Sequence, residues 1–281
     1  MNISDLISPP KPMSEEEATA FMNKQPSGSY QLVDVRQPGE YESDHIPGAT
    51  LVPLNVITAG GGDLDPQKPT IVYCRSGGRS HAAAQYLSGQ GFKEVYDIGA
   101  NIQSWLGIKA QGPYELSLDL IDPNVDFPDA FSLSYAMEDG LQRFYLKLEE
   151  KETRDSHKAL FKKLAGFEDL HMKRLLDAYA SLGSSGADPK QFLADNRKVI
   201  EGGDLVKSTP VSIISQLHDL LDIFGLSMAI EAQSLDLYTR MAGKSSDAAV
   251  KKLFLGLADE EKQHLTYITR ELDTHIKDKA R

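Results

Sequence analysis

The run Glu168-Asp169-Leu170-His171 occurs a second time as Glu261-Lys262-Gln263-His264, 93 residues further along the chain (261 − 168). A glutamate stands 30 residues before each run (168 − 138 and 261 − 231), and a tyrosine follows each of these glutamates by seven residues. The two pairs are Glu138 with Tyr145 and Glu231 with Tyr238. Residues i and i+3 project from one face of a helix, so each Glu-x-x-His run directs a carboxylate and an imidazole to one point. The repeat predicts two related helix pairs that form a four-helix bundle.

The repeat also predicts a metal site. Four carboxylates and two imidazoles are the ligand set with which a four-helix bundle binds two metal ions. Carboxylates on inward helix faces are costly to bury unless cations compensate their charge. Oxygen donors with few nitrogens favour iron or manganese, with zinc as a competitor. We therefore predict two iron ions, replaceable by manganese or zinc, and no organic cofactor. The predicted ligands are Glu138, Glu168, His171, Glu231, Glu261 and His264.

Two alternatives stay open for this set. The same residues could be solvated charges on amphipathic helices. Glu260 is a rival ligand to Glu261, because it precedes His264 by four residues, although the repeat favours Glu261. For Tyr145 and Tyr238 we expect hydrogen bonds around the ligands or packing in the core.

Composition limits the class of protein. The chain has 281 residues, enough for about two domains. A net charge of −11 argues against a broad nucleic-acid-binding surface, because phosphate contacts need clustered Lys and Arg. The sequence shows no secretory signal and no apolar run long enough to span a membrane, so we expect a cytoplasmic protein. The single cysteine excludes an intrachain disulfide and a four-cysteine metal site.

Residues 1–110 are predicted to form an α/β domain, a parallel sheet flanked by helices. Short β-prone runs occur at 30–36, 49–54, 69–74 and 94–98, and an alanine-rich helix is expected over 80–90. Residues 111–129 contain three prolines and are predicted to be the linker. From 130 to 281 we predict an all-α domain with helices at 130–151, 155–181, 211–242 and 246–277, the last capped by Ser245 or Ser246. A long crossover between the second and third helices, over 183–209, suits a ferritin-like bundle.

Cys74 stands between the third predicted strand and the helix at 80–90. The loop that follows it is predicted to bind the substrate or a persulfide, and it consists of Arg75, Ser76, Gly77, Gly78 and Arg79. Glycines allow backbone N–H groups to turn toward the sulfur, and the helix N-terminus and the arginines add positive charge. Each effect lowers the pKa of a thiol and stabilises a thiolate or a persulfide anion. The alternative is a buried structural cysteine beside an ordinary turn.

With these motifs, residues 14–106 resemble a single rhodanese domain. The matching features are Asp34-Val35-Arg36, Glu40-Tyr41, the run from His45 to Ala49, the Cys74 loop, and Gly99 before Trp105. The resemblance implies that Cys74 carries sulfane sulfur as a persulfide, from a donor such as thiosulfate or another persulfide to a thiophilic acceptor. The Cys74 loop has the shorter length that is typical of family members that transfer sulfur, not the longer length seen in related phosphatases. For Asp34, Arg36 and His45 we expect a role in bracing the fold.

Residues 130–277 resemble the rubrerythrin branch of the ferritin-like superfamily. That resemblance implies a di-iron site on the six predicted ligands and reduction of peroxide or oxygen with electrons from an external donor. Rubrerythrins usually carry a further glutamate where this chain has Ser234, and a four-cysteine module that one cysteine cannot supply.

The leading hypothesis is therefore a sulfurtransferase fused to a di-iron oxidoreductase. The second is a persulfide carrier whose bundle binds or senses iron without catalysis. The third is an empty bundle that serves as a homodimer platform. In none of them do we expect a nucleic acid or a membrane as partner.

Overall fold

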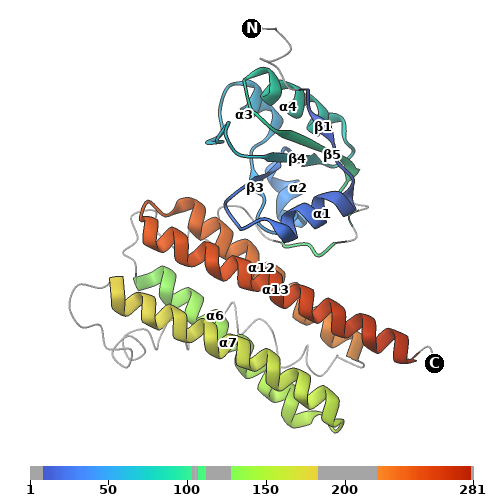
Figure 1. The fold of residues 1–281 in the computed structure, drawn as a ribbon, viewed down its shortest axis with the longest axis vertical. Coiled ribbons are helices and arrows are strands. Elements are labelled where there is room, and N and C mark those ends of the chain that lie inside the picture. Colours follow the sequence, from blue (N-terminus) through green and yellow to red (C-terminus); the bar gives the residue numbers. More distant parts are fainter. Residues whose placement is uncertain (1–8, 103–104, 106, 112–127, 183–219, 280–281) are drawn as a thin grey trace. The chain divides into compact units, whose positions relative to one another are not determined.

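The computed structural model describes residues 9–102, 105, 107–111, 128–182 and 220–279 (Figure 1). The predicted linker falls almost wholly outside these residues, as do the long crossover and the start of the third predicted helix. The chain divides into two compact units. One comprises Met1–Leu120 with Phe224–Arg281, and the other comprises Ile121–Ile223. The domain boundaries given above stay a prediction.

A five-stranded sheet organises the N-terminal part of the chain. Its strands lie in the order β1-β5-β4-β2-β3, and every neighbouring pair is parallel. The central strand β4 is buried along its whole length, as expected for a parallel strand covered on both faces. The strand bounds are β1 Lys11–Pro12, β2 Gln31–Asp34, β3 Thr50–Leu51, β4 Thr70–Cys74 and β5 Val95–Asn101.

Four helices accompany these strands: α1 Glu15–Lys24, α2 Pro38–Ser43, α3 Leu54–Thr58 and α4 Gly78–Gly89. A capping box starts α1, in which the Ser14 hydroxyl accepts the Glu17 N–H and the Glu17 carboxylate accepts the Ser14 N–H. Proline at the first position favours the start of α2. Sequence patterns anticipated only α4, because α1, α2 and α3 are short or weakly periodic.

The side chains of β4 alternate between two cores. Ile71 and Tyr73 pack in the core that includes α1 residues, whereas Val72 and Cys74 pack in the core that includes α3 and α4 residues. Figure 1 shows α1 and α2 on one side of the strands and α3 and α4 on the other. Cys74 therefore ends the central strand at the carboxyl edge of a parallel sheet, where such sheets usually bind ligands.

Four long helices form the rest of the described chain: α6 Pro128–Lys151, α7 Asp155–Leu182, α12 Leu220–Lys244 and α13 Ala248–Lys279. Residues 152–154 join α6 to α7 and residues 245–247 join α12 to α13, so each pair is an antiparallel hairpin. The N-cap of α13 is Asp247, whose Oδ1 accepts the Ala249 and Val250 N–H groups at 2.7 and 3.1 Å. The expectation of a Ser245 or Ser246 cap was wrong, because the helix starts beyond both serines.

The predicted fold class, an α/β domain followed by an all-α region, is confirmed by these elements. The four predicted strands and the long helices match to within a few residues at their ends, apart from the predicted start of the third long helix at residue 211, which lies outside the described residues. Among the described helices, none combines the length and apolarity needed to cross a membrane.

Candidate functional site

Cys74 is fully buried at the end of β4, and the next residues turn sharply into α4. The Gly77 N–H donates a hydrogen bond to Sγ of Cys74 over 3.1 Å. The thiol lies 3.6 Å from the Ser80 hydroxyl oxygen, which in turn donates to the Gly77 carbonyl over 2.9 Å. Backbone and hydroxyl groups of one short segment thus surround the sulfur.

The loop favours an anionic sulfur. Burial by itself raises the pKa of the Cys74 thiol. Hydrogen bonds from Ser80, through its backbone and its side chain, and from the backbone of Ser76 and Gly77 outweigh burial and lower the pKa below that of an ordinary cysteine. The N-terminus of α4 adds partial positive charge at the same place. A thiol in this environment is a candidate nucleophile rather than inert packing.

Gly77 is required by the shape of the loop. Its φ of +85° lies in the left-handed region, and a Cβ there would meet the Gly99 carbonyl oxygen at 2.9 Å. Because that oxygen belongs to the backbone of β5, the contact cannot be relieved by a side-chain rotation. Only glycine therefore lets the chain turn its N–H toward Cys74 without strain.

The two arginines of the loop differ in their surroundings. Arg79 donates to both oxygens of Glu40 on α2, at 2.6 and 2.8 Å. This hydrogen bonding lowers the pKa of Glu40 to about 2. The pKa of Arg79 is raised mainly by Glu40 and to a lesser degree by Cys74, which lies within electrostatic reach. Arg75 is exposed to solvent.

Asp34 and Arg36 form a buried network next to this loop. Arg36 Nε donates to both Asp34 oxygens at 2.9 and 3.0 Å, and its guanidinium also reaches Asp44 at 3.2 Å. The His45 ring stacks on Tyr41, with ring centroids 3.7 Å apart. These contacts tie β2 to the end of α2, which agrees with the bracing role expected from the sequence.

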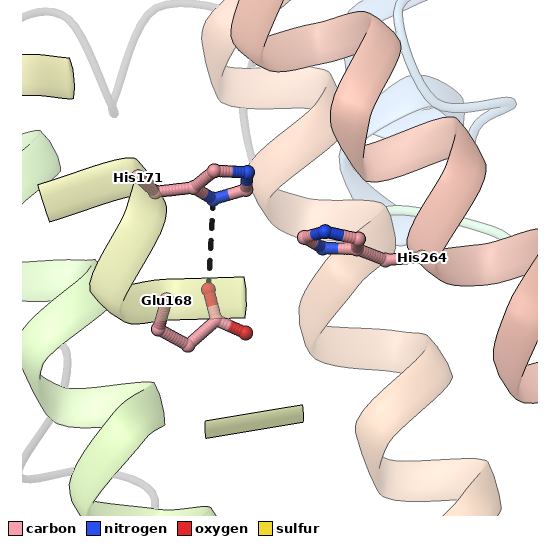
Figure 2. A group of neighbouring side chains, drawn as sticks. All are labelled: Glu168, His171 and His264. Atoms are coloured by element: carbon pink, nitrogen blue, oxygen red, sulfur yellow. Dashed lines mark ion pairs between the residues drawn. The ribbon is translucent and has the colours of Figure 1, made fainter. Parts of the chain in front are cut away.

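The first predicted ligand group lies on α6 and α7 and consists of Glu138, Glu168 and His171. All three side chains are buried. Nδ1 of His171 lies 3.3 Å from a Glu138 oxygen and 3.6 Å from a Glu168 oxygen. Figure 2 draws the Glu168–His171 ion pair on α7, together with His264 of α13. We name Glu138, Glu168 and His171 the α6–α7 group.

The second group has the same form on α12 and α13 and consists of Glu231, Glu261 and His264. These side chains are also buried. Nδ1 of His264 lies 3.2 Å from a Glu231 oxygen and 3.4 Å from a Glu261 oxygen. One ligand atom from each residue falls within 4.8 Å of the others, close enough to share one metal ion. We name these residues the α12–α13 group.

The two groups fit a metal by their chemistry. Each presents two carboxylates and an imidazole from buried helix faces, and each imidazole nitrogen approaches both carboxylates of its group. Buried carboxylates of like charge need a compensating cation. Tyr145 and Tyr238 are completely buried on α6 and α12, and Tyr238 stacks on Phe254 with centroids 6.0 Å apart. Glu260, the rival ligand, is only partly buried.

Sequence reasoning missed the roles of two residues near Cys74. Ser80 was noted as the start of a helix, yet its hydroxyl faces the sulfur. Its position six residues after the cysteine, in the first helical turn, was the available signal. Glu40 was noted without a role. Its pairing with Arg79 joins residues 39 positions apart, so no local pattern reveals it.

Comparison with known proteins gives matches to the N-terminal part. Residues 17–107 match the rhodanese-like domain family. The chain is 37% identical over 102 residues to the uncharacterized protein YqhL of Bacillus subtilis, covering 36% of this chain and 77% of that protein. It is 40% identical over 74 residues to the thiosulfate sulfurtransferase GlpE of Pseudomonas syringae, covering 26% of this chain and 70% of that enzyme. It is also 36% identical over 89 residues to the putative sulfur carrier protein YrkF of Bacillus subtilis, covering 31% and 48% of the two chains.

Proposed function

Because the chain belongs to the rhodanese-like family through residues 17–107, we propose that it transfers sulfane sulfur through a persulfide on Cys74. The observation that carries the proposal is the hydrogen bond from the Gly77 N–H to Sγ, made by a glycine in the left-handed region. This contact, the lowered pKa of the thiol and the α4 N-terminus all favour negative charge on sulfur.

Thiosulfate is the donor suggested by the similar sulfurtransferase. The Cys74 thiolate attacks the outer sulfur of thiosulfate, a bond forms from Sγ to that sulfur, and the sulfur–sulfur bond of thiosulfate breaks. Sulfite leaves with the electron pair. A thiophilic acceptor, cyanide or a thiolate, then attacks the outer sulfur of the persulfide, and Cys74 leaves as a thiolate. The loop N–H groups stabilise the thiolate at both ends of this cycle.

The direct test is steady-state sulfur transfer from thiosulfate to cyanide by the full chain, followed as thiocyanate formation. Sustained turnover that is lost in Cys74→Ser supports a catalyst. The carrier alternative is favoured by the similarity to a putative sulfur carrier. A carrier would take up one sulfur per Cys74 and release it to a partner without repeated turnover.

For the helical part we propose a di-iron site of rubrerythrin type, with the α6–α7 group and the α12–α13 group as the ligands. The support is their matching chemistry and spacing: two buried carboxylates and one imidazole in each, 93 residues apart. Bound iron would supply the redox chemistry for reducing peroxide or oxygen. The electrons come from an external donor, because one cysteine cannot build a four-thiolate iron centre in this sequence.

The test of this second part is the metal content of protein purified without added metal and after anaerobic reconstitution with iron. About two iron ions per chain are expected from this type of ligand set. Glu168→Ala and Glu261→Ala each remove a ligand from one group and should lower that number. A chain that takes up no iron under either condition contradicts the di-iron proposal and leaves the sulfurtransferase proposal intact.

A further inference from the structure

Two loops of the α/β domain contact the helices that carry the α12–α13 group. The Asp236 carboxylate of α12 is completely buried, accepts the Gly48 N–H at 2.9 Å and lies 3.2 Å from His45 Nε2. Arg240, one turn further along α12, reaches the same carboxylate at 2.6 Å. Residues 45–48 are therefore held by α12.

The second contact is made by α13. The Asp259 carboxylate accepts the Ser27 N–H at 2.8 Å. The Lys262 ammonium donates to the Met22 and Gln25 carbonyl oxygens at 3.4 and 3.3 Å and lies 5.3 Å from the centre of the Tyr30 ring. Residues 22–30 are therefore held by α13.

Glycines occupy the points of closest approach in both contacts. Gly48 has a φ of +80°, and a Cβ there would lie 3.3 Å from the Thr239 hydroxyl oxygen. Gly28 has a φ of +79°, and a Cβ there would lie 2.8 Å from a Leu255 methyl carbon. Both loops thus pass against the helices with no side chain between, so the contacts depend on the exact placement of α12 and α13.

The helix residues that contact the α/β domain, which we call the docking residues, lie on the helix faces opposite the predicted ligands. They are Asp236 of α12 and Asp259 and Lys262 of α13. On α13, Asp259 and Lys262 precede Glu261 and His264 by two positions each, which is about 160° around a helix with 3.6 residues per turn. On α12, Asp236 follows Glu231 by five positions, about 140° around the axis. The same turns therefore present ligands on one face and docking groups on the other.

We propose that docking of the α/β domain and metal binding by the α12–α13 group are thermodynamically coupled. A metal ion held by Glu231, Glu261 and His264 fixes α12 relative to α13. The α/β domain does the same from the opposite side, because one loop holds α12 and the other holds α13. Two events that select one arrangement of the same two helices favour each other, and the coupling is reciprocal. The inference rests on the proposed metal site.

The experiment titrates the full chain with Co²⁺ and uses two readouts. The visible spectrum of bound Co²⁺ gives the metal affinity. The fluorescence of Trp105, the single tryptophan of the chain and a buried residue of the α/β core, gives the thermal unfolding midpoint of that domain. In the wild-type protein, Co²⁺ should raise the Trp105 midpoint.

The coupling is tested with Asp236→Ala, which removes the contact between α12 and residues 45–48 without changing a predicted ligand. We expect Co²⁺ affinity to fall by about fivefold or more, and the rise in the Trp105 midpoint on Co²⁺ addition to be largely lost. Asp236→Asn keeps the size of the side chain and gives a milder form of the same result should the alanine variant fold poorly. Asp273→Ala, an exposed carboxylate of α13, is the control and should behave as wild type.

The outcomes distinguish failure of the coupling from failure of the proposed metal site. Wild-type Co²⁺ affinity and an unreduced midpoint rise in both Asp236 variants overturn the coupling and leave the metal site standing. A chain that shows no bound-Co²⁺ spectrum overturns both. Thiosulfate turnover should persist in the Asp236 variants, which shows that their α/β domain remains folded.

Discussion

The Cys74 loop and the carboxylate–histidine groups are built in opposite ways. The loop takes its chemistry from neighbours in sequence: the Gly77 N–H, the Ser80 hydroxyl and the start of α4 all lie within six residues of the sulfur. Each ligand group joins two helices, with Glu138 and His171, or Glu231 and His264, 33 positions apart. A site made by one loop tolerates little change in its backbone, whereas a site made by two helices depends on their packing.

The largest expected effect separates the two chemistries. Cys74→Ser should lower the rate of sulfur transfer by about three orders of magnitude or more. A serine hydroxyl is not ionised near neutral pH, and it cannot form a persulfide. Iron content should not change, since Cys74 lies outside both ligand groups. Thiocyanate formation and elemental analysis measure the two quantities. Substantial turnover in the serine variant would mean that another group carries the sulfur.

The second-largest expected effect is on metal affinity, and two adjacent glutamates of α13 test which residues are the ligands. Glu261→Gln should weaken metal binding by more than about tenfold, because it removes a buried carboxylate 3.4 Å from His264. Glu260→Gln is the matched control and should leave the affinity nearly unchanged. Metal titration of both variants gives the comparison. If Glu260→Gln had the larger effect, the ligand assignment from the 93-residue repeat would be wrong.

A backbone change in the loop should give an intermediate effect. Gly77→Ala places a side chain at positive φ and 2.9 Å from the Gly99 oxygen, so we expect a loss of about 1–3 kcal/mol in unfolding free energy and a lower rate of sulfur transfer. Gly89→Ala, at the end of α4, should be nearly neutral because a Cβ added there would meet no atom within 4 Å. Chemical denaturation of both variants checks this. Equal stability of the two would show that the loop is not constrained as its geometry indicates.

The smallest effect concerns pH. The pKa of Cys74 lies below its ordinary value despite burial, partly through Ser80. Ser80→Ala removes the side-chain hydrogen bond, so the thiol pKa should rise and the acid limb of the kcat/KM profile should move to higher pH. Ser88→Ala, another buried serine of α4, is the control. An unshifted profile in Ser80→Ala would indicate that the backbone N–H groups alone hold the thiolate.

The sequence predicted those parts of the molecule in which local rules dominate. The apolar character of 69–74 indicated a buried strand, and the Cys74 loop indicated the strand-to-helix turn. The periodic Glu and His positions indicated long helices. Short elements were missed: α2 has six residues and α3 has five, so their periodicity is too brief to recognise. The cap of α13 was misassigned because serine and aspartate are nearly equal N-cap residues.

By itself, the sequence determined the fold class, the position of the candidate nucleophile Cys74 and the two triads of candidate ligands, because apolar strand runs, helix periodicity and turn chemistry act over a few residues. Only the tertiary structure decided which distant groups meet. It brought Glu40 to Arg79, and it buried Asp236 against His45 and Gly48. Such contacts depend on how helices and loops pack, and no spacing along the chain encodes a partner 188 positions away.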